Sequence, residues 1–108
     1  MATVINLRTA PHELRRTCVK IDRTTRWGNP FVMLKGDAAE RAFVIGMHRT
    51  WLWEQLRTGK VTLEDLAALD GKFLGCWCAP APCHGHTLAR AAIWAKAQLA
   101  AKAPAISA

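Results

Sequence analysis

The sequence predicts one small domain of the α/β or α+β class, with a short sheet and about three helices. Three observations predict it: short segments rich in β-branched residues, longer segments with helical spacing, and the interleaving of the two along the chain. A length of 108 residues allows one core, and 51% hydrophobic with 21% charged residues is a globular composition. We therefore expect residues 1–108 to form a single domain, with a core over about residues 4–100 and a frayed carboxyl end.

Three segments have the composition of strands. "ATVINLR" (2–8) and "TCVKID" (17–22) supply β-branched residues, and Pro11 breaks any continuous element between them. The apolar run "KFLGCWC" (72–78) is typical of a buried strand. "RTTRWGNPF" (23–31) contains Gly-Asn-Pro, which excludes a helix there and predicts an ordered turn or loop.

The central part of the chain predicts one long helix over residues 38–58. Asp37, with a glutamate three positions later, is a typical amino-terminal cap. Phe43, Met47 and Trp51 then recur every four residues before a glycine ends the segment.

Two more helices are predicted on either side of the third strand. Thr62 and the two acidic residues after it open a short helix that runs to about Leu69. The alanine-rich segment from Thr87 predicts another helix, and its buried stripe consists of Leu88, Ala91, Ala92, Ala95 and Leu99. We expect Trp53 and Trp94, which also stand at helical spacings, to serve packing.

The charge balance favours anionic partners. The chain has 15 lysines and arginines against 8 aspartates and glutamates, which gives a net charge of +7 and a pI near 9.8. Phosphates, nucleotides and nucleic acids are the partners that such a surface attracts. The first residues hold no apolar leader segment, and no stretch approaches the roughly 20 apolar residues of a membrane span. We expect a cytoplasmic protein without a membrane partner.

The reactive side chains gather in "CWCAPAPCHGH" (76–86). Cys76, Cys78 and Cys83 form a cluster, which in a reducing compartment indicates metal binding or reactivity rather than disulfides. The cluster lies where a strand ends and a helix begins, which is where α/β sheets usually bind ligands. Cys18 stands apart, and we expect it to be a buried apolar residue.

Two motifs together resemble one family. "RTTRWGNPF" near the amino end and "LGCWCAPAPCHGHTL" (74–88) near the carboxyl end, with a helix carrying Trp51 between them, are similar to the uncharacterised phage and bacterial family known as domain of unknown function 4326. The resemblance covers about residues 4–95. It implies a phage-related protein, acting in the host cytoplasm if a phage encodes it, and it points to the two motifs as the site. It implies no particular activity.

The first hypothesis for the site is a metal centre. The thiolates of Cys76, Cys78 and Cys83, with the imidazole of His84 or His86, form the sulfur and nitrogen set that Zn²⁺ prefers. The two sulfurs of Cys-x-Cys lie on one face of an extended strand, so joint ligation requires the strand to bend. Zinc is the cofactor that this hypothesis predicts.

The second hypothesis is a metal-free pocket for a nucleotide or a nucleic-acid end. Cys83 precedes a helix whose free N–H groups lower a thiol pKa and attract phosphate, and His84 or His86 supplies a base or proton donor. Cys83 and His84 are thus the candidate catalytic residues. The candidate ligand-binding residues come from the other motif, which we expect to meet the first at one sheet edge: Arg23 and Arg26 for phosphates, Trp27 for stacking on a base, and Asn29.

A third hypothesis is an interaction protein that docks onto a host protein without catalysis, with or without zinc, through one or two of its five tryptophans. Plain packing roles stay open too, because strand cysteines are often inert core residues and Asn29 can brace its own turn. The remaining histidines, His12 and His48, are expected at the surface or on a helix face. No carboxylate pair, phosphate-binding glycine loop or serine triad appears, so the sequence leaves open whether the protein is an enzyme.

Overall fold

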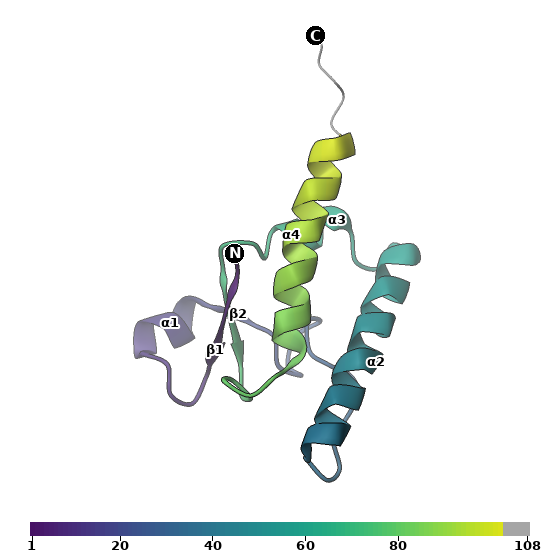
Figure 1. Ribbon diagram of the computed structural model, residues 1–108. Helices are drawn as coiled ribbons and strands as arrows, with labels where there is room; N and C mark the ends of the chain where they lie inside the picture. Colours follow the sequence, from purple (N-terminus) through teal and green to yellow (C-terminus); the bar gives the residue numbers. More distant parts are fainter. Residues whose placement is uncertain (103–108) are drawn as a thin grey trace.

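The computed structural model, which describes residues 1–102, combines a three-stranded parallel sheet with helices, and so confirms the mixed α/β class (Figure 1). In Figure 1 the sheet lies on one side of the long carboxyl-terminal helix and the central helix lies on its other side. The elements in chain order are β1 (Thr3–Asn6), α1 (His12–Thr17), β2 (Val19–Lys20), α2 (Ala38–Arg57), α3 (Leu63–Ala67), β3 (Phe73–Cys76) and α4 (His84–Lys102). The frayed end predicted from the sequence falls in 103–108, outside the described residues.

The sheet has the order β1-β3-β2, so the strand nearest the carboxyl end lies in the middle. Leu74 of β3 pairs with Val4 on one side and with Val19 on the other. Gly75 is required beside them, because an added Cβ would lie 2.6 Å from the side chain of Leu7. Since all three strands are parallel, their carboxyl ends lie along one edge of the sheet.

Helix α1 was not expected from the sequence. It follows Pro11 directly and has no buried residue, so it leaves no apolar periodicity for a sequence pattern to detect. Cys18, predicted to be buried, is only half-buried at the end of this helix. Its Sγ atom nevertheless approaches β3, since a Cβ on Gly75 would lie 2.8 Å from it.

Helix α2 agrees closely with the predicted range 38–58. The side chain of Asp37 caps it by accepting a hydrogen bond from the backbone N–H of Glu40 at 2.8 Å. The Glu40 carboxylate turns back and accepts hydrogen bonds from the backbone N–H groups of the preceding turn, among them that of Leu34 at 2.9 Å. The cap therefore fixes both the start of the helix and the loop that leads into it.

The face of α2 that meets the core differs from the periodic one in the sequence. The buried residues are Val44, His48 and Leu52, each one position after the recurring aromatic and methionine residues, and Phe43 is 66% exposed. Apolar residues stand on several sides of this helix, so the four-residue spacing alone does not select the buried one. Of the two positions predicted for His48, the surface is excluded, because the side chain is fully buried on the inner face of α2.

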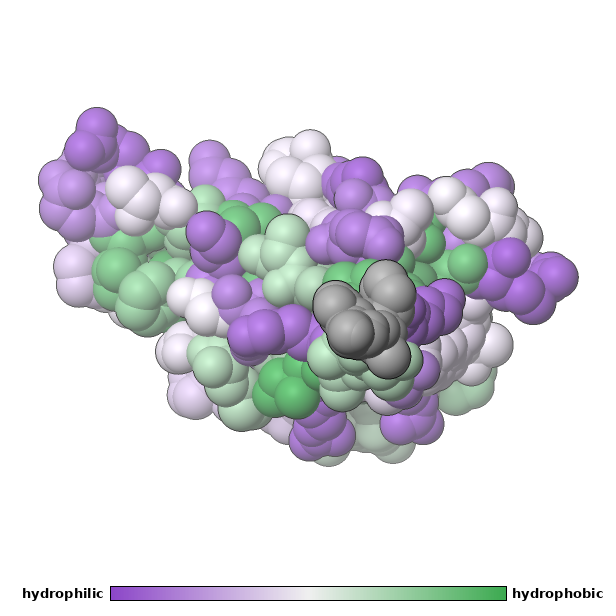
Figure 2. Space-filling view, turned by 90° about the horizontal axis from the view of Figure 1, so that it is seen from above, coloured by the Kyte–Doolittle hydropathy of each residue, from purple (hydrophilic) through white to green (hydrophobic). Residues whose placement is uncertain are grey.

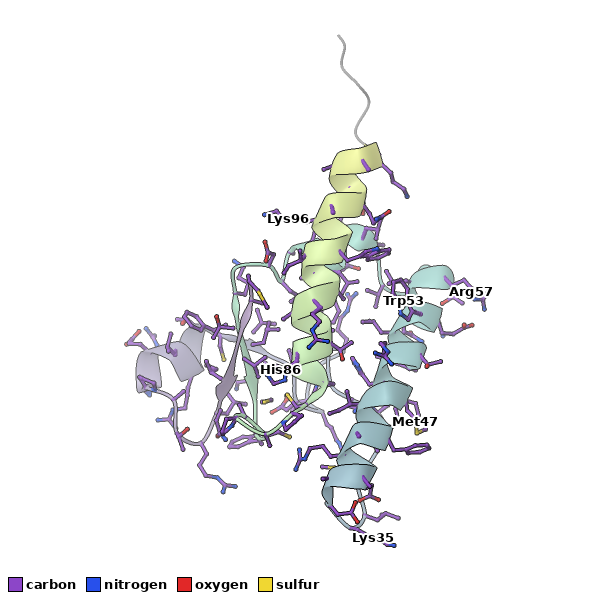
Figure 3. All side chains as sticks on the ribbon, viewed as in Figure 1. Lys35, Met47, Trp53, Arg57, His86 and Lys96 are labelled. Carbon is purple, nitrogen blue, oxygen red and sulfur yellow. The ribbon has the colours of Figure 1, made fainter. Side chains whose placement is uncertain are left out.

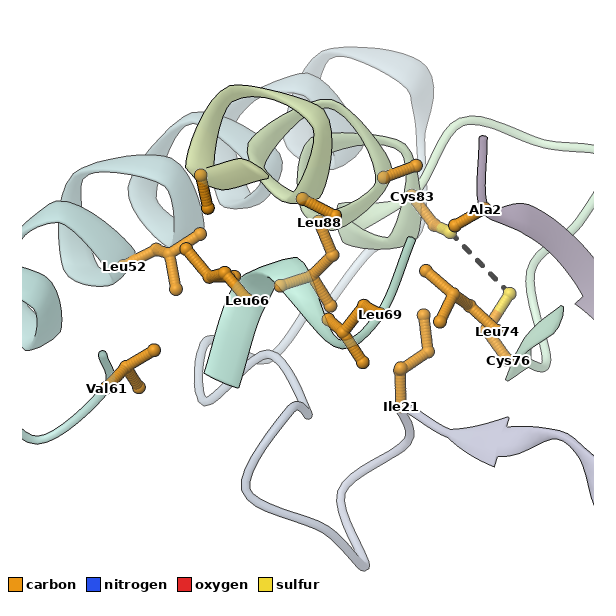
Figure 4. Packing of buried hydrophobic residues seen from close by; sticks show 13 residues of the cluster. Ala2, Ile21, Leu52, Val61, Leu66, Leu69, Leu74, Cys76, Cys83 and Leu88 are labelled. Carbon is orange, nitrogen blue, oxygen red and sulfur yellow. Dashed lines mark hydrogen bonds between the residues drawn. The ribbon is translucent and has the colours of Figure 1, made fainter. Parts of the chain in front are cut away.

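The core lies between β3, α3 and α4. Thr62 opens α3, as the sequence predicted, and it forms a capping box with Asp65. Helix α4 begins at His84, three residues before the predicted start, and buries Leu88, Ala92 and Ala95. The small volumes of the two alanines let the helix approach its neighbours closely. Figure 4 shows how the core residues pack: Ile21, Leu66, Leu69, Leu74 and Leu88 among them.

The molecule is elongated, with extents of 54 × 31 × 20 Å. Viewed along α4 from its carboxyl end, apolar residues reach the surface between polar ones (Figure 2). Large exposed apolar side chains include Trp77 at 54% and Trp53 at 50% exposure. Within residues 1–102, no helix has both the length and the apolar character needed to cross a membrane.

Candidate functional site

A pocket of about 450 Å³ lies at the carboxyl edge of the sheet. Its walls come from the segment after β2, the segment after β3 and the amino-terminal half of α2, so residues of both sequence motifs line it. The lining residues are Asp22, Arg23, Thr24, Asn29, Phe31, Met33, Arg41, Val44, Ile45, Cys76, Trp77, Cys78, Pro82, Cys83 and His84. Its volume falls in the range of pockets that bind small organic ligands.

Asp22 links the two loops at the edge of this pocket. Its carboxylate accepts hydrogen bonds from the backbone N–H of Thr24 at 3.0 Å and from the indole Nε1 of Trp77 at 3.2 Å, and the Thr24 hydroxyl also donates to it. These bonds, led by that of the Thr24 hydroxyl, lower the pKa of Asp22. The ionised carboxylate therefore holds the Trp77 ring beside the pocket at neutral pH.

The Gly-Asn-Pro turn is braced against α2. Asn29 donates from Nδ2 to the backbone carbonyl of Val44 at 3.2 Å, and its Oδ1 accepts from the backbone N–H of Phe31 at 2.9 Å. Gly28 passes so close to the preceding segment that an added Cβ would lie 2.4 Å from the carbonyl oxygen of Asp22. Both ends of the Asn29 amide are thus engaged in shaping the loop, although Asn29 also lines the pocket.

Two arginines reach the pocket. Arg23 comes from the loop after β2, and Arg41 comes from α2 and donates from Nη1 to the backbone carbonyl of Pro82 at 3.2 Å. Neither forms a salt bridge with a carboxylate of the described residues. Their positive charges are therefore available to a ligand.

Arg26 and Trp27, two of the predicted ligand-binding residues, do not line the pocket. The Arg26 guanidinium pairs with Asp65 of α3 at 2.9 Å and lies 4.9 Å from the centre of the Trp27 ring. Trp27 is partly buried and packs against the core. The aromatic rings that do line the pocket are those of Phe31 and Trp77.

Cys76 and Cys83 bring two thiols to one point in the pocket wall. Cys76 ends β3 and Cys83 precedes α4, and their Sγ atoms lie 3.6 Å apart (Figure 4). The hydrogen bond from Cys83, aided by the backbone N–H groups of Cys78 and Ala79, lowers the pKa of Cys76 to about 6. The same bond and burial raise the pKa of Cys83. These opposite shifts favour a thiolate on Cys76 over one on Cys83.

His84, the first residue of α4, is buried in the wall of the pocket. Its Nε2 lies 2.7 Å from the backbone carbonyl of Ile21, which fixes the amino end of α4 beside the end of β2. Burial lowers the pKa of His84, and the carbonyls of Ile21 and Trp27 oppose that shift. The catalytic roles of Cys83 and His84 stay predictions.

His48 lies behind His84 in the interior. The ring centroids of the two histidines are 4.9 Å apart, and neither ring nitrogen of His48 has a hydrogen-bond partner among residues 1–102. Burial, followed by repulsion from His84, lowers the pKa of His48 to about 4. His48 is therefore neutral at physiological pH.

The other candidate metal ligands lie close by but do not complete a cluster. Cys78 is half-buried and lines the pocket, whereas His86 is exposed and its Nδ1 accepts from the backbone N–H of Cys83 at 3.4 Å. Among residues 1–102, no three His, Cys, Asp or Glu side chains gather where they could hold a metal ion. The zinc hypothesis stays a prediction.

Sequence reasoning missed several residues of the pocket. Arg41 and Ile45 come from α2, and nothing in their local pattern separates them from other helix residues. Trp77 had a detectable signal, because it stands inside the Cys-x-Cys motif at the carboxyl end of a strand, where α/β sheets usually bind ligands.

Comparison with known proteins places this architecture in a family. Residues 5–94 match the family described as domain of unknown function (DUF4326). The chain belongs to this family. The matched region contains both motifs and every described residue that lines the pocket, so the pocket lies within the DUF4326 domain.

A relative of the DUF4326 domain occurs in Enterobacteria phage T4, where it is named "Uncharacterized 12.4 kDa protein in nrdA-td intergenic region". It is 37% identical over 71 residues, which cover 66% of this chain and 63% of the relative. The chain thus matches less than two thirds of that relative's length. No solved structure matches the chain.

Proposed function

We propose that this DUF4326 domain binds a nucleotide, or the phosphate-bearing end of a nucleic acid, in the pocket at the carboxyl edge of the sheet. The observation that carries the proposal is the position of Arg23 and Arg41, free of carboxylate partners among the described residues, on a pocket with mostly apolar walls. Guanidinium groups bind phosphate oxygens in a fixed geometry, and an aromatic ring such as Trp77 stacks on a base.

The amino end of α4 supports the same ligand. Cys83 and His84 place this end of a 19-residue helix in the pocket wall. The helix dipole favours negative charge there, and the net charge of +7 favours an anion over the whole surface. The proposal concerns binding, and a reaction at the thiol pair would be a further step.

Isothermal titration calorimetry tests the proposal with purine and pyrimidine mononucleotides, the matching nucleosides and inorganic phosphate. We expect the nucleotides to bind more tightly than either fragment. Arg23→Ala should weaken nucleotide binding by roughly tenfold, because a charge-assisted hydrogen bond is lost. The matched control is Arg15→Ala, which removes an equal charge from the exposed surface of α1.

The absence of binding by every mononucleotide at millimolar concentration would contradict the proposal. So would an equal loss of affinity in Arg23→Ala and Arg15→Ala, since it would show an effect of net charge rather than of the pocket.

Zinc binding is a second candidate function, and the spacing of the thiol pair favours it. Two thiolates on a tetrahedral zinc ion, with Zn–S distances of about 2.3 Å, lie about 3.8 Å apart. The Sγ atoms of Cys76 and Cys83 are 3.6 Å apart, which is close to that spacing. Cys78 or His86 would have to turn toward this pair to complete a site.

Elemental mass spectrometry on untagged protein, purified without chelator, tests this candidate beside a Cys83→Ala variant. Near-stoichiometric zinc that disappears in Cys83→Ala supports a metal site. Metal-free protein with reactive thiols contradicts it and favours the nucleotide pocket.

A further inference from the structure

The pocket continues into a row of hollows along α2, the middle one of which lies between α2 and α4. A hollow of about 470 Å³ shares Arg41 and Ile45 with the pocket and adds Arg49. A second hollow, of about 250 Å³, also contains Arg49 and extends to Trp53 and Trp94. A third hollow, of about 520 Å³, lies on the far side of these two tryptophans. We call these three connected hollows the helix groove. In Figure 1 the two helices run side by side with their amino ends at the same end of the molecule.

The spacing of residues on α2 explains why the groove is continuous. Arg41, Ile45, Arg49 and Trp53 follow one another at intervals of four, so they form a stripe along one side of the helix, next to its buried face. At a rise of about 1.5 Å per residue this stripe is about 18 Å long. On α4, Arg90 and Trp94 repeat the same interval opposite it.

The groove is positively charged. No aspartate or glutamate is found among the described residues that line its three hollows, whereas Arg41, Arg49 and Arg90 line them and form no salt bridge with a described carboxylate. The other side of α2 is different. The hollow there is lined by Phe43, Met47 and other residues that include a glutamate and no arginine. The positive charge of the arginines therefore favours an anionic ligand on the side of α2 that faces α4.

Aromatic rings stand in the same groove. Trp53 and Trp94 form an edge-to-face pair with centroids 4.8 Å apart, and they remain 50% and 37% exposed. Figure 3 shows Trp53 on the part of α2 near α4. An edge-to-face pair covers only one face of one ring, so ring surface is left on which an unpaired base can stack.

From this arrangement we infer that the helix groove binds single-stranded nucleic acid, with the arginines on its phosphates and a base on the tryptophan pair, while the end of the strand enters the pocket. The inference rests on the proposed function and extends its ligand from a nucleotide to a strand. Arginines interleaved with exposed aromatic rings are the combination by which proteins hold single strands without reading their sequence. A duplex would not fit this role, because its bases are already paired and stacked.

Fluorescence anisotropy with labelled single-stranded DNA and RNA of about 9 nucleotides tests the inference. The test variant is Arg49→Ala with Arg90→Ala, and its matched control is Arg15→Ala with Arg16→Ala on exposed α1. We expect the groove variant to bind roughly tenfold more weakly, and its slope of log K against log salt to shrink by about 1.4. The control should keep the slope of the unchanged protein. The DNA and RNA arms identify which sugar the groove accepts.

Mononucleotide titration of the same variants separates this inference from the proposed function. Strand binding that is lost in the groove variant, with mononucleotide binding intact, supports both. Oligonucleotides that bind no more tightly than a mononucleotide overturn the inference alone, as does tighter binding of a duplex or an equal loss in the control. If neither mononucleotide nor oligonucleotide binds, both fail together.

Discussion

The two sides of α4 are built in different ways. Toward the sheet and α3, it packs Leu88 and small alanines against a closely packed apolar core. Toward α2, the contacts include the aromatic pairs His48–His84 and Trp53–Trp94. Close apolar packing stabilises a fold and leaves no room for a ligand, whereas a few ring contacts leave hollows beside them. The difference explains why the pocket and the helix groove both lie on the α2 side.

The largest effect is expected from Leu66→Ala, on the packed side. Leu66 is fully buried in α3, and its truncation leaves a cavity among the core leucines. We expect the free energy of unfolding to fall by about 3 to 4 kcal/mol, measured by urea denaturation. Leu34→Ala, at a residue 87% exposed, is the control and should change it by less than about 0.5 kcal/mol. A loss below about 1 kcal/mol in Leu66→Ala would mean that this side is loosely packed.

A smaller effect is expected on the α2 side from protonation of His48. Because its folded pKa of about 4 lies below the ordinary 6.5, the unfolded chain binds a proton more readily. The free energy of unfolding should therefore be highest above pH 7 and fall as the pH drops through 6.5 toward 4. We expect a loss of about 2 kcal/mol between pH 7 and 5. His48→Leu should flatten this dependence, measured by urea denaturation at each pH.

The control for this pH effect is His12→Ala, which removes an exposed histidine from α1. It should leave the pH profile unchanged. An equally steep loss of stability in His48→Leu would show that other groups cause the acid sensitivity.

Sequence patterns predicted the features that local contacts decide, and they failed where distant contacts decide. Caps such as Asp37 and Thr62 are local, because a side chain and a backbone group three residues apart decide them, and both were predicted. The buried face of α2 depends on which neighbour packs against it, so the pattern that ends in Trp51 was one residue away from the true core face. Helix α1 has no buried residue and gave no signal.

In the candidate site, too, local features were predicted correctly and features that depend on distant contacts were not. The strand end and the loop before α4 placed Cys76, Cys83 and His84 together, since these residues are neighbours in the sequence. Arg26 was chosen with Arg23 because the two lie on one short loop, yet the loop turns between them. Which side of a turn an arginine occupies is decided by distant partners, and no pattern within the loop contains that information.

The smallest effect on stability is expected when Arg26 and Arg23 are each replaced by alanine. The same pair of variants also tests where the pocket ends. Arg26→Ala removes a partly exposed ion pair with Asp65, so unfolding should become easier by only about 0.5 kcal/mol while nucleotide affinity stays unchanged. Arg23→Ala should do the reverse, with unchanged stability and weaker nucleotide binding. Urea denaturation and calorimetry in one buffer measure both quantities. If Arg26→Ala weakens nucleotide binding as much as Arg23→Ala does, the ligand extends outside the pocket toward α3, and its binding surface is wider than the pocket walls.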